Sequence, residues 1–189
     1  MGWRHSGELL AAARSVYTEF KDVCVWIKDD AQPGLLYRSQ HELIFVFRTG
    51  KAPPGDNIQL DQHDRHRTNV WRYRRVNSLP RRGREGKQSV FHAAIKPVEL
   101  VADAILDCTA QGDIVLDPFL GSGTTVIAAE RTGRICYGIE LDPRNVDVIV
   151  RRWQSFTGQT AVQEATGRTF NEIEQEQHGQ TNRAATTWD

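Results

Sequence analysis

The chain has 189 residues with equal numbers of basic and acidic side chains, so its net charge gives no global attraction to nucleic acid. Its hydrophobic content of 39% and charged content of 25% are ordinary for a globular domain with a sizeable core. The sequence has no apolar run near the roughly 18 residues of a membrane helix, no signal peptide, and no metal-site spacing among its three cysteines. These features predict a cytoplasmic protein with reduced thiols and no membrane partner.

The first part of the chain predicts one helix followed by two strands. Ser6 suits a helix N-cap, and apolar residues recur after it at helical spacing, namely Leu9, Leu10, Ala13, Val16, Tyr17 and Phe20. The runs at 22–28 and 41–48 are apolar on both faces and rich in β-branched and aromatic residues. Such runs are typical of strands that are buried on both faces.

Residues 49–92 show no clear period and contain several prolines and glycines, which predicts a long irregular region. Within it, basic residues greatly outnumber acidic ones between 61 and 87, and Trp71 and Tyr73 lie among them. A charge run of this kind is either a solvated loop or a surface for nucleic acid. The histidines and aspartates at 61–66 match no defensible metal site, so no metal is expected.

The second part of the chain alternates between strands and helices. Strands are predicted at 113–117 and 135–140, and helices begin at Pro97, at Thr124 and at the Asp142-Pro143 pair. This succession predicts an α/β fold with a parallel sheet and helices on both sides of it. Residues 1–160 are expected to form this domain, and residues 161–189 a polar C-terminal tail.

A glycine-containing segment, "DPFLGSGTT", joins the first of these two strands to its helix. Asp117 ends that strand, Gly121 and Gly123 follow, and Glu140 ends the next strand. Ligands of open α/β sheets bind at the carboxyl ends of the strands, where a carboxylate can accept hydrogen bonds from ribose hydroxyls. Glycines allow a ligand to approach the backbone closely, although they can also merely form a tight turn. The combination favours a nucleoside-containing cofactor.

The identity of that cofactor depends on what the segment lacks. A dinucleotide fingerprint needs a third glycine where Val126 stands, and a phosphate-binding loop of a triphosphatase needs a lysine. Asp117 would also place a negative charge beside a pyrophosphate. S-adenosyl-L-methionine carries a sulfonium, an α-ammonium and a ribose, and carboxylates suit two of these groups. The sequence therefore favours this cofactor over a nicotinamide dinucleotide.

Three segments resemble motifs of DNA amino-methyltransferases that act on adenine N6 or cytosine N4. "DPFLGSGTT" is similar to their cofactor motif, "GIELDP" to the motif that follows it, and "HAAIKPVEL" to the segment that precedes it in the permuted β-type members. Ala93 replaces a proline of that segment. Residues 36–48 and 69–71 are also similar, so the resemblance covers roughly residues 1–160. It implies a Rossmann-like methyltransferase fold.

The resemblance also implies roles for individual residues. Asp117 would bind the α-ammonium of S-adenosylmethionine, Glu140 the ribose hydroxyls, and Lys96 would lie near the methionine carboxylate. Phe119 and the turn Gly121-Ser122-Gly123 would shape the methionine side. The region before Lys96 would contact DNA, with its arginines on the phosphates, through Arg65, Arg67, Trp71, Arg72, Arg74 and Arg75.

The catalytic loop of this family is absent from the sequence. Family members transfer the methyl group at an Asp/Asn/Ser-Pro-Pro-aromatic loop that holds the flipped base. The only Pro-Pro pair here is preceded by Ala52, which has no acceptor, and followed by Gly55, which has no ring. We therefore expect the C-terminal portion of a methyltransferase, incomplete at its N-terminus and inactive alone. The alternatives are a non-catalytic module that binds cofactor or DNA, or a subunit that a second chain completes.

Overall fold

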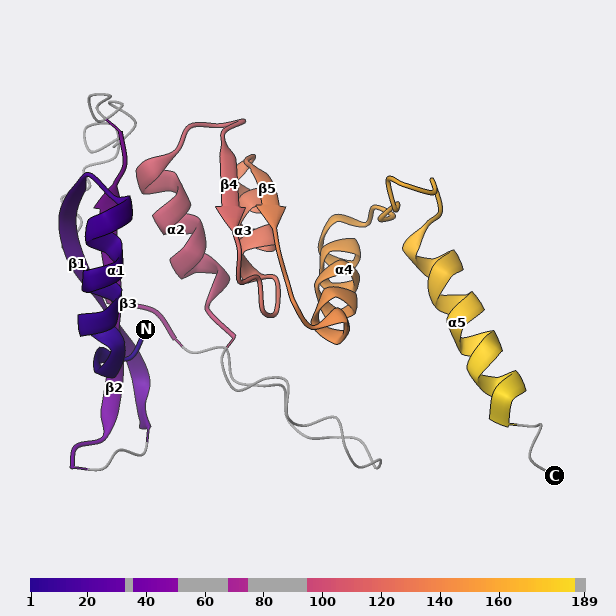
Figure 1. Ribbon diagram of the computed structural model, residues 1–189, viewed down its shortest axis with the longest axis horizontal. Helices are drawn as coiled ribbons and strands as arrows, with labels where there is room; N and C mark the ends of the chain where they lie inside the picture. Colours follow the sequence, from indigo (N-terminus) through magenta and orange to yellow (C-terminus); the bar gives the residue numbers. More distant parts are fainter. Residues whose placement is uncertain (33–35, 51–67, 75–94, 186–189) are drawn as a thin grey trace.

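The computed structural model describes residues 1–32, 36–50, 68–74 and 95–185 (Figure 1). None of the helices in these residues is long and apolar enough to cross a membrane. The elements in chain order are a 3-10 helix η1 (Trp3–His5), α1 (Ser6–Val16), β1 (Glu19–Gln32), β2 (Ser39–Arg48), β3 (Val70–Arg72), α2 (Val98–Cys108), β4 (Ile114–Asp117), α3 (Thr124–Thr132), β5 (Ile135–Gly138), α4 (Pro143–Thr157) and α5 (Phe170–Ala185).

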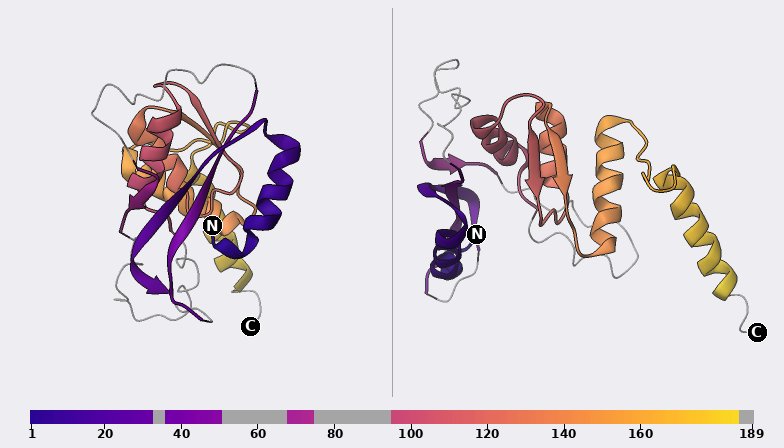
Figure 2. Two further views of the ribbon diagram at one scale, coloured as in Figure 1. Left: turned by 90° about the vertical axis from the view of Figure 1, so that its left-hand side faces the viewer. Right: turned by 45° about the horizontal axis from the view of Figure 1, so that its top comes forward.

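The strands predicted in the first part of the chain form an antiparallel hairpin, β1–β2, with β3 added parallel to β1. Successive side chains of β2 point to opposite faces. Ile44 and Val46 pack against a core of Trp26, Trp71 and Leu100, which brings α2 onto that face. The rings of Phe45 and Phe47 point to the other face, which α1 covers in the side views (Figure 2).

The helical face predicted from Leu9 to Phe20 ends earlier than its period suggests. Helix α1 stops at Val16, because Tyr17 adopts an extended conformation and its N–H bonds to the carbonyl of Ala13. Phe20 then belongs to β1 and pairs with Phe47 of β2. Strand pairing therefore overrides the helical period at the end of the run.

The second sheet consists of β4 and β5, which are parallel as predicted, with Ile114 opposite Ile135 and Asp117 opposite Gly138. Helices α2 and α3 pack on each other and cover one face, with Ala102, Ile105, Ala128 and Ala129 against the strand residues Val115 and Cys136. Helix α3 ends at a left-handed Gly133, as predicted. Helix α2 begins one residue after Pro97, whose extended ψ of 134° makes it the cap rather than the first helical residue.

The opposite face of the β4–β5 sheet is apolar and open. Ile114, Leu116, Ile135 and Tyr137 all point to it, and each side chain is at least half exposed. Within the described residues, β4 also has no neighbour on the edge away from β5. Helices were predicted on both sides of the parallel sheet, but the described residues cover only one face of these two strands.

The polar C-terminal region contains a helix, α5, that lies beyond α4 at one end of the molecule (Figure 1). Arg151 of α4 forms an ion pair with Glu174 and lies 5.4 Å from the centre of the Phe170 ring. Gln154 donates a hydrogen bond to Asn171 at 3.2 Å. These contacts attach α5 to α4 through polar side chains rather than through a core.

Candidate functional site at the glycine loop

The loop between β4 and α3 lies at the carboxyl ends of both parallel strands. Gly121 and Gly123 have φ values of +55° and +79°, a region that side chains rarely adopt. A Cβ on Gly123 would also lie 2.8 Å from Cγ2 of Ile149 on α4. The loop therefore needs glycine for its turn and, at Gly123, for its close contact with α4.

A third glycine, which the sequence analysis did not single out, holds the loop against β5. A Cβ on Gly138 would lie only 2.2 Å from Cδ1 of Leu120, so the leucine side chain occupies the space above this strand position. The N–H of Leu120 also donates to the carbonyl of Ile139 at 3.1 Å. The available signal was a glycine inside a predicted strand, which often marks a close approach of another part of the chain.

Asp117 accepts hydrogen bonds from the loop and from the start of α3 through its two carboxylate oxygens. Oδ1 accepts a hydrogen bond from the N–H of Phe119 at 2.9 Å, and Oδ2 accepts one from the hydroxyl of Thr125 at 2.6 Å. A carboxylate has roughly four lone-pair positions, so each oxygen retains capacity for another donor. Asp117 is thus fixed in place and still able to bind a cationic group.

Glu140 lies just beyond the end of β5 and bonds to the loop from the other side. Its Oε2 accepts from the N–H of Gly121 at 2.8 Å, and its Oε1 accepts from the N–H of Asp142 at 3.0 Å and from Asn145 at 3.1 Å. The hydrogen bonds from Asp142, Asn145 and Gly121 lower the pKa of Glu140. The site therefore carries two carboxylates at adjacent strand ends.

Arg152 of α4 is a further residue of the site that sequence reasoning missed. Its guanidinium donates to the carbonyl of Ser122, and partial burial lowers the pKa of Arg152. Arg152 lies three residues after Ile149, on the helix face that packs against the loop, and this spacing was the only available signal. The side chain of Ser122 itself lies 3.5 Å from the hydroxyl of Thr124.

Two apolar side chains stand exposed beside the carboxylates. Phe119 is 87% exposed and Leu141, which follows Glu140 directly, is 96% exposed. Apolar surface next to a few fixed polar groups is typical of a small-molecule site. The sequence analysis predicted Phe119 as a residue of the cofactor site, and it did not predict Leu141.

Lys96 lies beside the first turn of α3, where its backbone carbonyl accepts a hydrogen bond from the hydroxyl of Thr124 at 3.2 Å. Its ammonium group donates to the carboxylate of Glu42 at 2.9 Å and lies 5.6 Å from the centre of the Trp26 ring. The predicted partner of Lys96 was the carboxylate of a ligand. The structure shows that the lysine also has a carboxylate partner within the chain.

The predicted DNA contacts are only partly visible. Arg65, Arg67 and Arg75 lie outside the described residues, whereas Arg72 and Arg74 are exposed at β3 and just after it. The prediction that Trp71 contacts DNA is corrected, because this residue is only 8% exposed and packs in the core beside Trp26. Strand alternation turns Trp71 inward and its neighbours outward, which leaves its ring no surface for a base.

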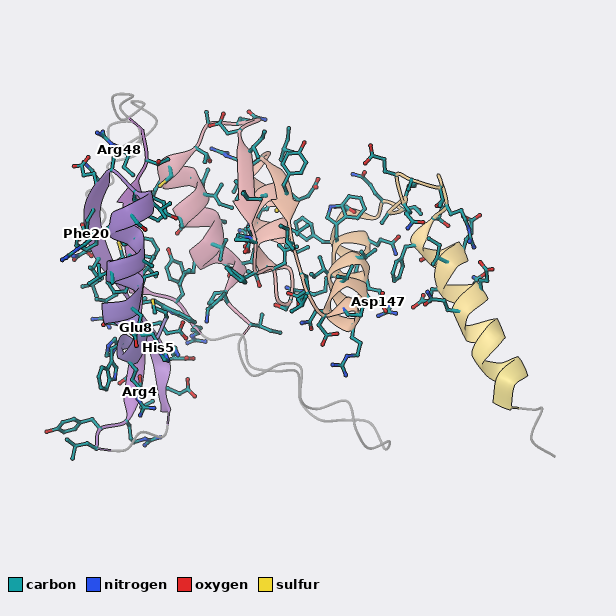
Figure 3. The ribbon with its side chains drawn as sticks, viewed as in Figure 1. Arg4, His5, Glu8, Phe20, Arg48 and Asp147 are labelled. Carbon is teal, nitrogen blue, oxygen red and sulfur yellow. The ribbon has the colours of Figure 1, made fainter. Side chains whose placement is uncertain are left out.

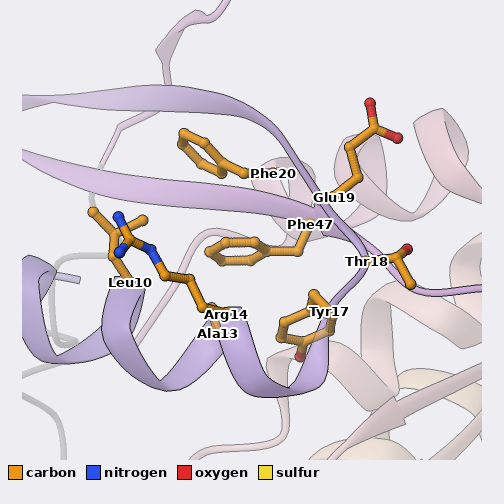
Figure 4. Close-up of a pocket in the computed structure, with 8 residues that line it drawn as sticks. All are labelled: Leu10, Ala13, Arg14, Tyr17, Thr18, Glu19, Phe20 and Phe47. Atoms are coloured by element: carbon orange, nitrogen blue, oxygen red, sulfur yellow. The ribbon is translucent and has the colours of Figure 1, made fainter.

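A separate pocket of about 430 Å³ lies between α1 and the β1–β2 hairpin, with Phe20 and Phe47 facing Leu10 and Arg14 of the helix (Figure 4). It shares no residue with the glycine loop. Figure 3 labels Arg48 near one end of α1, Arg4, His5 and Glu8 near the other, and Phe20 between them. The described part of the chain contains no group of three or more side chains that could hold a metal ion.

Comparison with known proteins places these features in a family. The model of the family described as DNA methylase (N6_N4_Mtase) matches residues 6–151. Type II methyltransferase M.Cfr9I of Citrobacter freundii is 35% identical over 138 residues, which are 69% of this chain and 43% of the relative. Type II methyltransferase M2.MboI of Moraxella bovis is 30% identical over 143 residues, or 72% and 50% of the two chains. The chain thus spans about half the length of these curated relatives.

Solved structures show the same fold. A putative DNA modification methylase of Thermus thermophilus, complexed with S-adenosyl-L-methionine, superposes with a TM-score of 0.59 at 25% identity. The match covers 82% of this chain and 61% of that one. The cytosine-N4-specific PvuII DNA methyltransferase superposes with a TM-score of 0.60 at 19% identity, over 79% and 56% of the two chains. The fold is therefore the Rossmann-like fold of these methyltransferases.

Proposed function

This chain belongs to the DNA methylase family, and we propose that it forms the cofactor-binding part of an S-adenosylmethionine-dependent DNA methyltransferase acting on adenine N6 or cytosine N4. One observation carries the proposal. Asp117 and Glu140 stand at the carboxyl ends of two adjacent parallel strands, and the loop between β4 and α3 donates a backbone N–H to each carboxylate, from Phe119 to Asp117 and from Gly121 to Glu140. Parallel α/β sheets bind their ligands at this edge.

The residues present fit S-adenosylmethionine. Asp117 retains lone pairs for the α-ammonium, and Glu140 retains one of roughly four for a ribose hydroxyl. A ribose at Glu140 would bring the purine against exposed Leu141, while Phe119 would border the methionine side. When bound, the cofactor supplies an electrophilic methyl group. The chain's own residues bind and orient it, and Arg152 keeps the Ser122 carbonyl in place.

DNA is the proposed substrate, and the described residues offer it only positioning contacts. Arg72 and Arg74 are exposed cations that suit phosphate groups, which orient a duplex without reading its sequence. Methyl transfer additionally needs acceptors for the target amino group and a ring for the flipped base. The sequence contains no acceptor-Pro-Pro-aromatic run, so we propose that the chain alone is inactive.

A second candidate is a subunit that another polypeptide completes, and the open face of the β4–β5 sheet favours it. Parallel strands are normally covered on both faces. Here Ile114, Leu116, Ile135 and Tyr137 leave one face apolar and exposed. A strand added to the free edge of β4 would have to run parallel to β4 if its following loop is to reach the cofactor beside Asp117. The partner we propose is therefore an apolar strand followed by the catalytic loop.

The cytoplasm is the proposed compartment. No disulfide joins Cys24, Cys108 or Cys136. Burial, reinforced by the charges of neighbouring aspartates, raises the pKa of Cys108 and Cys136 and keeps these thiols protonated. Cysteines that form no disulfide are usual in reducing compartments.

Calorimetric titration of the purified chain with S-adenosylmethionine and, separately, with NAD tests the cofactor assignment. We expect binding of the first ligand and at least tenfold weaker binding of the second, because Asp117 would lie beside the pyrophosphate of NAD. Equal or tighter binding of NAD would reject the proposal. Adenosine serves as a reference for contacts that any nucleoside makes.

A further inference from the structure

We propose that Glu42 is a positioning residue of the cofactor site, which holds the ammonium groups of Lys28 and Lys96 side by side to receive the carboxylate of S-adenosylmethionine. The inference rests on the proposed function, and it adds two residues, Glu42 and Lys28, to which the family resemblance assigned no role. Three observations support it: the geometry of the cluster, its charge, and the link from the backbone of Lys96 through the first turn of α3 to Asp117.

The cluster is built on a rigid platform. Glu42 of β2 pairs across the hairpin with Trp26 of β1, whose side chain is 3% exposed and whose indole N–H donates to the carbonyl of Tyr73 at 2.9 Å. The two lysine ammonium groups lie 5.3 Å and 5.6 Å from the centre of the Trp26 ring. Glu42 binds Lys28 at 2.8 Å through one oxygen and Lys96 at 2.9 Å through the other.

The cluster has more positive than negative charge. Burial opposes ionisation of Glu42, but hydrogen bonds from Lys28 and Lys96 and their charges outweigh it and lower the pKa of Glu42 to about 2. One carboxylate therefore faces two lysines, and the amino group of Met1 also lies 3.6 Å from it. The side chain of Lys28 is only 11% exposed, so water compensates its charge poorly. A second carboxylate would bring the two lysines to neutrality.

The place of the cluster suggests which carboxylate it receives. Thr124 and Thr125 are consecutive residues in the first turn of α3: the hydroxyl of the first bonds to the carbonyl of Lys96, and that of the second bonds to Asp117. The backbone of Lys96 and the carboxylate of Asp117 are therefore both hydrogen-bonded to the start of α3, while the ammonium group of Lys96 bonds to Glu42. The amino-acid end of S-adenosylmethionine carries an ammonium and a carboxylate on one carbon atom, and this pair of opposite charges is complementary to it.

Glu42 contributes by preorganisation. A lysine side chain loses much rotamer freedom when it binds a ligand, and a carboxylate that already holds it removes most of that cost. Without Glu42, Lys28 and Lys96 would repel each other at the same ring. The expected loss on removing Glu42 is therefore confined to ligands that possess the amino-acid carboxylate.

Two nucleoside ligands separate this role from a purely structural one. S-adenosylhomocysteine carries the amino-acid group, whereas 5′-methylthioadenosine has the same thioether and nucleoside without it. Glu42→Gln should weaken the first roughly ten- to hundredfold and change the second less than about twofold. Lys28→Gln should give the same pattern and provides the test if Glu42→Gln does not fold. Glu19→Gln is the matched control, since Glu19 also pairs with two cations, Lys21 and Arg48.

The outcomes are distinguishable. Equal losses for both ligands would show that Glu42 and Lys28 only support the fold, and unchanged affinity for S-adenosylhomocysteine would show that they do not act on the carboxylate. Either result overturns the inference and leaves the proposed function standing. If the unmodified chain binds neither nucleoside, the proposed function fails and the inference fails with it. In Glu42→Asp, a partial recovery of the preference for S-adenosylhomocysteine over 5′-methylthioadenosine would support positioning by the negative charge.

Discussion

The carboxylate of Glu140 accepts a hydrogen bond from the backbone N–H of Gly121 at 2.8 Å, across nineteen residues of sequence. This bond ties the end of β5 to the turn after β4. The residue expected to receive a ribose is therefore also a structural part of the loop, and its orientation is set before any ligand binds. Preorganisation of this kind lowers the cost of binding.

The charge of Asp117 is expected to determine cofactor affinity. Asp117→Asn keeps one oxygen acceptor for the loop but removes the negative charge that would bind the α-ammonium. Affinity for S-adenosylmethionine should fall roughly ten- to hundredfold in calorimetry. Asp147→Asn is the control, because Asp147 lies on α4 and pairs with Arg151 at 3.8 Å (Figure 3). Equal affinities of the two variants would contradict the assigned role of Asp117.

Gly123 is expected to matter for packing as well as for backbone conformation. Gly123→Ala would combine a strained φ of +79° with a clash against Ile149, and should lower the free energy of unfolding by roughly 2–4 kcal/mol. Gly158→Ala has a similar φ of +71° and no atom within 4 Å of the new Cβ, so it reports strain alone. Urea unfolding of both variants measures the difference. Equal urea midpoints of the two variants would show that α4 moves away from the added methyl group without loss of stability.

The loop could be predicted from sequence because its signals are local. Asp117, Gly121 and Gly123 follow one another within a short stretch, and the turn they form depends on backbone conformation. The contacts that were missed depend on distant packing: Glu42 meets Lys96 across 54 residues, and Arg152 meets Ser122 across 30. Trp71 shows the same limit, since a basic run suggested an exposed ring and strand alternation buried it.

Stability should depend on pH through Glu42. Its pKa is about 2 in the folded chain and 4.5 without its partners, so the lysine contacts stabilise the fold fully above about pH 4.5 and lose effect as the pH falls toward 2. Because Lys96 is 41% exposed, solvent screening limits this contribution to roughly 1–3 kcal/mol. The difference in urea midpoint between the unmodified chain and Glu42→Gln should therefore be smaller at pH 3 than at pH 6, because pH 3 lies between the two pKa values of Glu42. A constant difference would contradict the ionic role.

DNA binding is expected to be salt-dependent and largely independent of sequence. Replacing Arg72 and Arg74 with glutamine removes two exposed cations, so the slope of log affinity against log salt concentration should decrease by about two. Fluorescence anisotropy with two unrelated duplexes measures this slope. Arg131→Gln is the control, because Arg131 pairs with Glu99 on the helix pair α2–α3. An unchanged slope in the double variant would place DNA elsewhere on the molecule.

The chain alone is expected to transfer no methyl group to DNA above background. An amino group conjugated to a base ring is a poor nucleophile, and it needs acceptors that hold it as its nitrogen turns toward the methyl group. Such positioning can contribute roughly 7–11 kcal/mol to lowering a barrier. Cofactor binding at Asp117 does not supply it, and the sequence offers no acceptor-Pro-Pro-aromatic run. Tritiated methyl transfer to unmethylated genomic DNA is the assay, and robust transfer by the chain alone would show that the catalytic groups lie elsewhere.

Adding a polypeptide that carries an apolar strand followed by an Asp-Pro-Pro-Tyr loop should produce transfer if the open edge of β4 is a docking surface. Leu116→Asp tests the surface itself, because Leu116 is 66% exposed on the bare sheet face and a carboxylate there costs the isolated chain little. Val16→Asp is matched in exposure, at 66%, but lies on α1. Transfer on mixing should be lost in Leu116→Asp and kept in Val16→Asp. If both variants behave alike, the added polypeptide does not bind at the β4–β5 face, and the second candidate function is rejected.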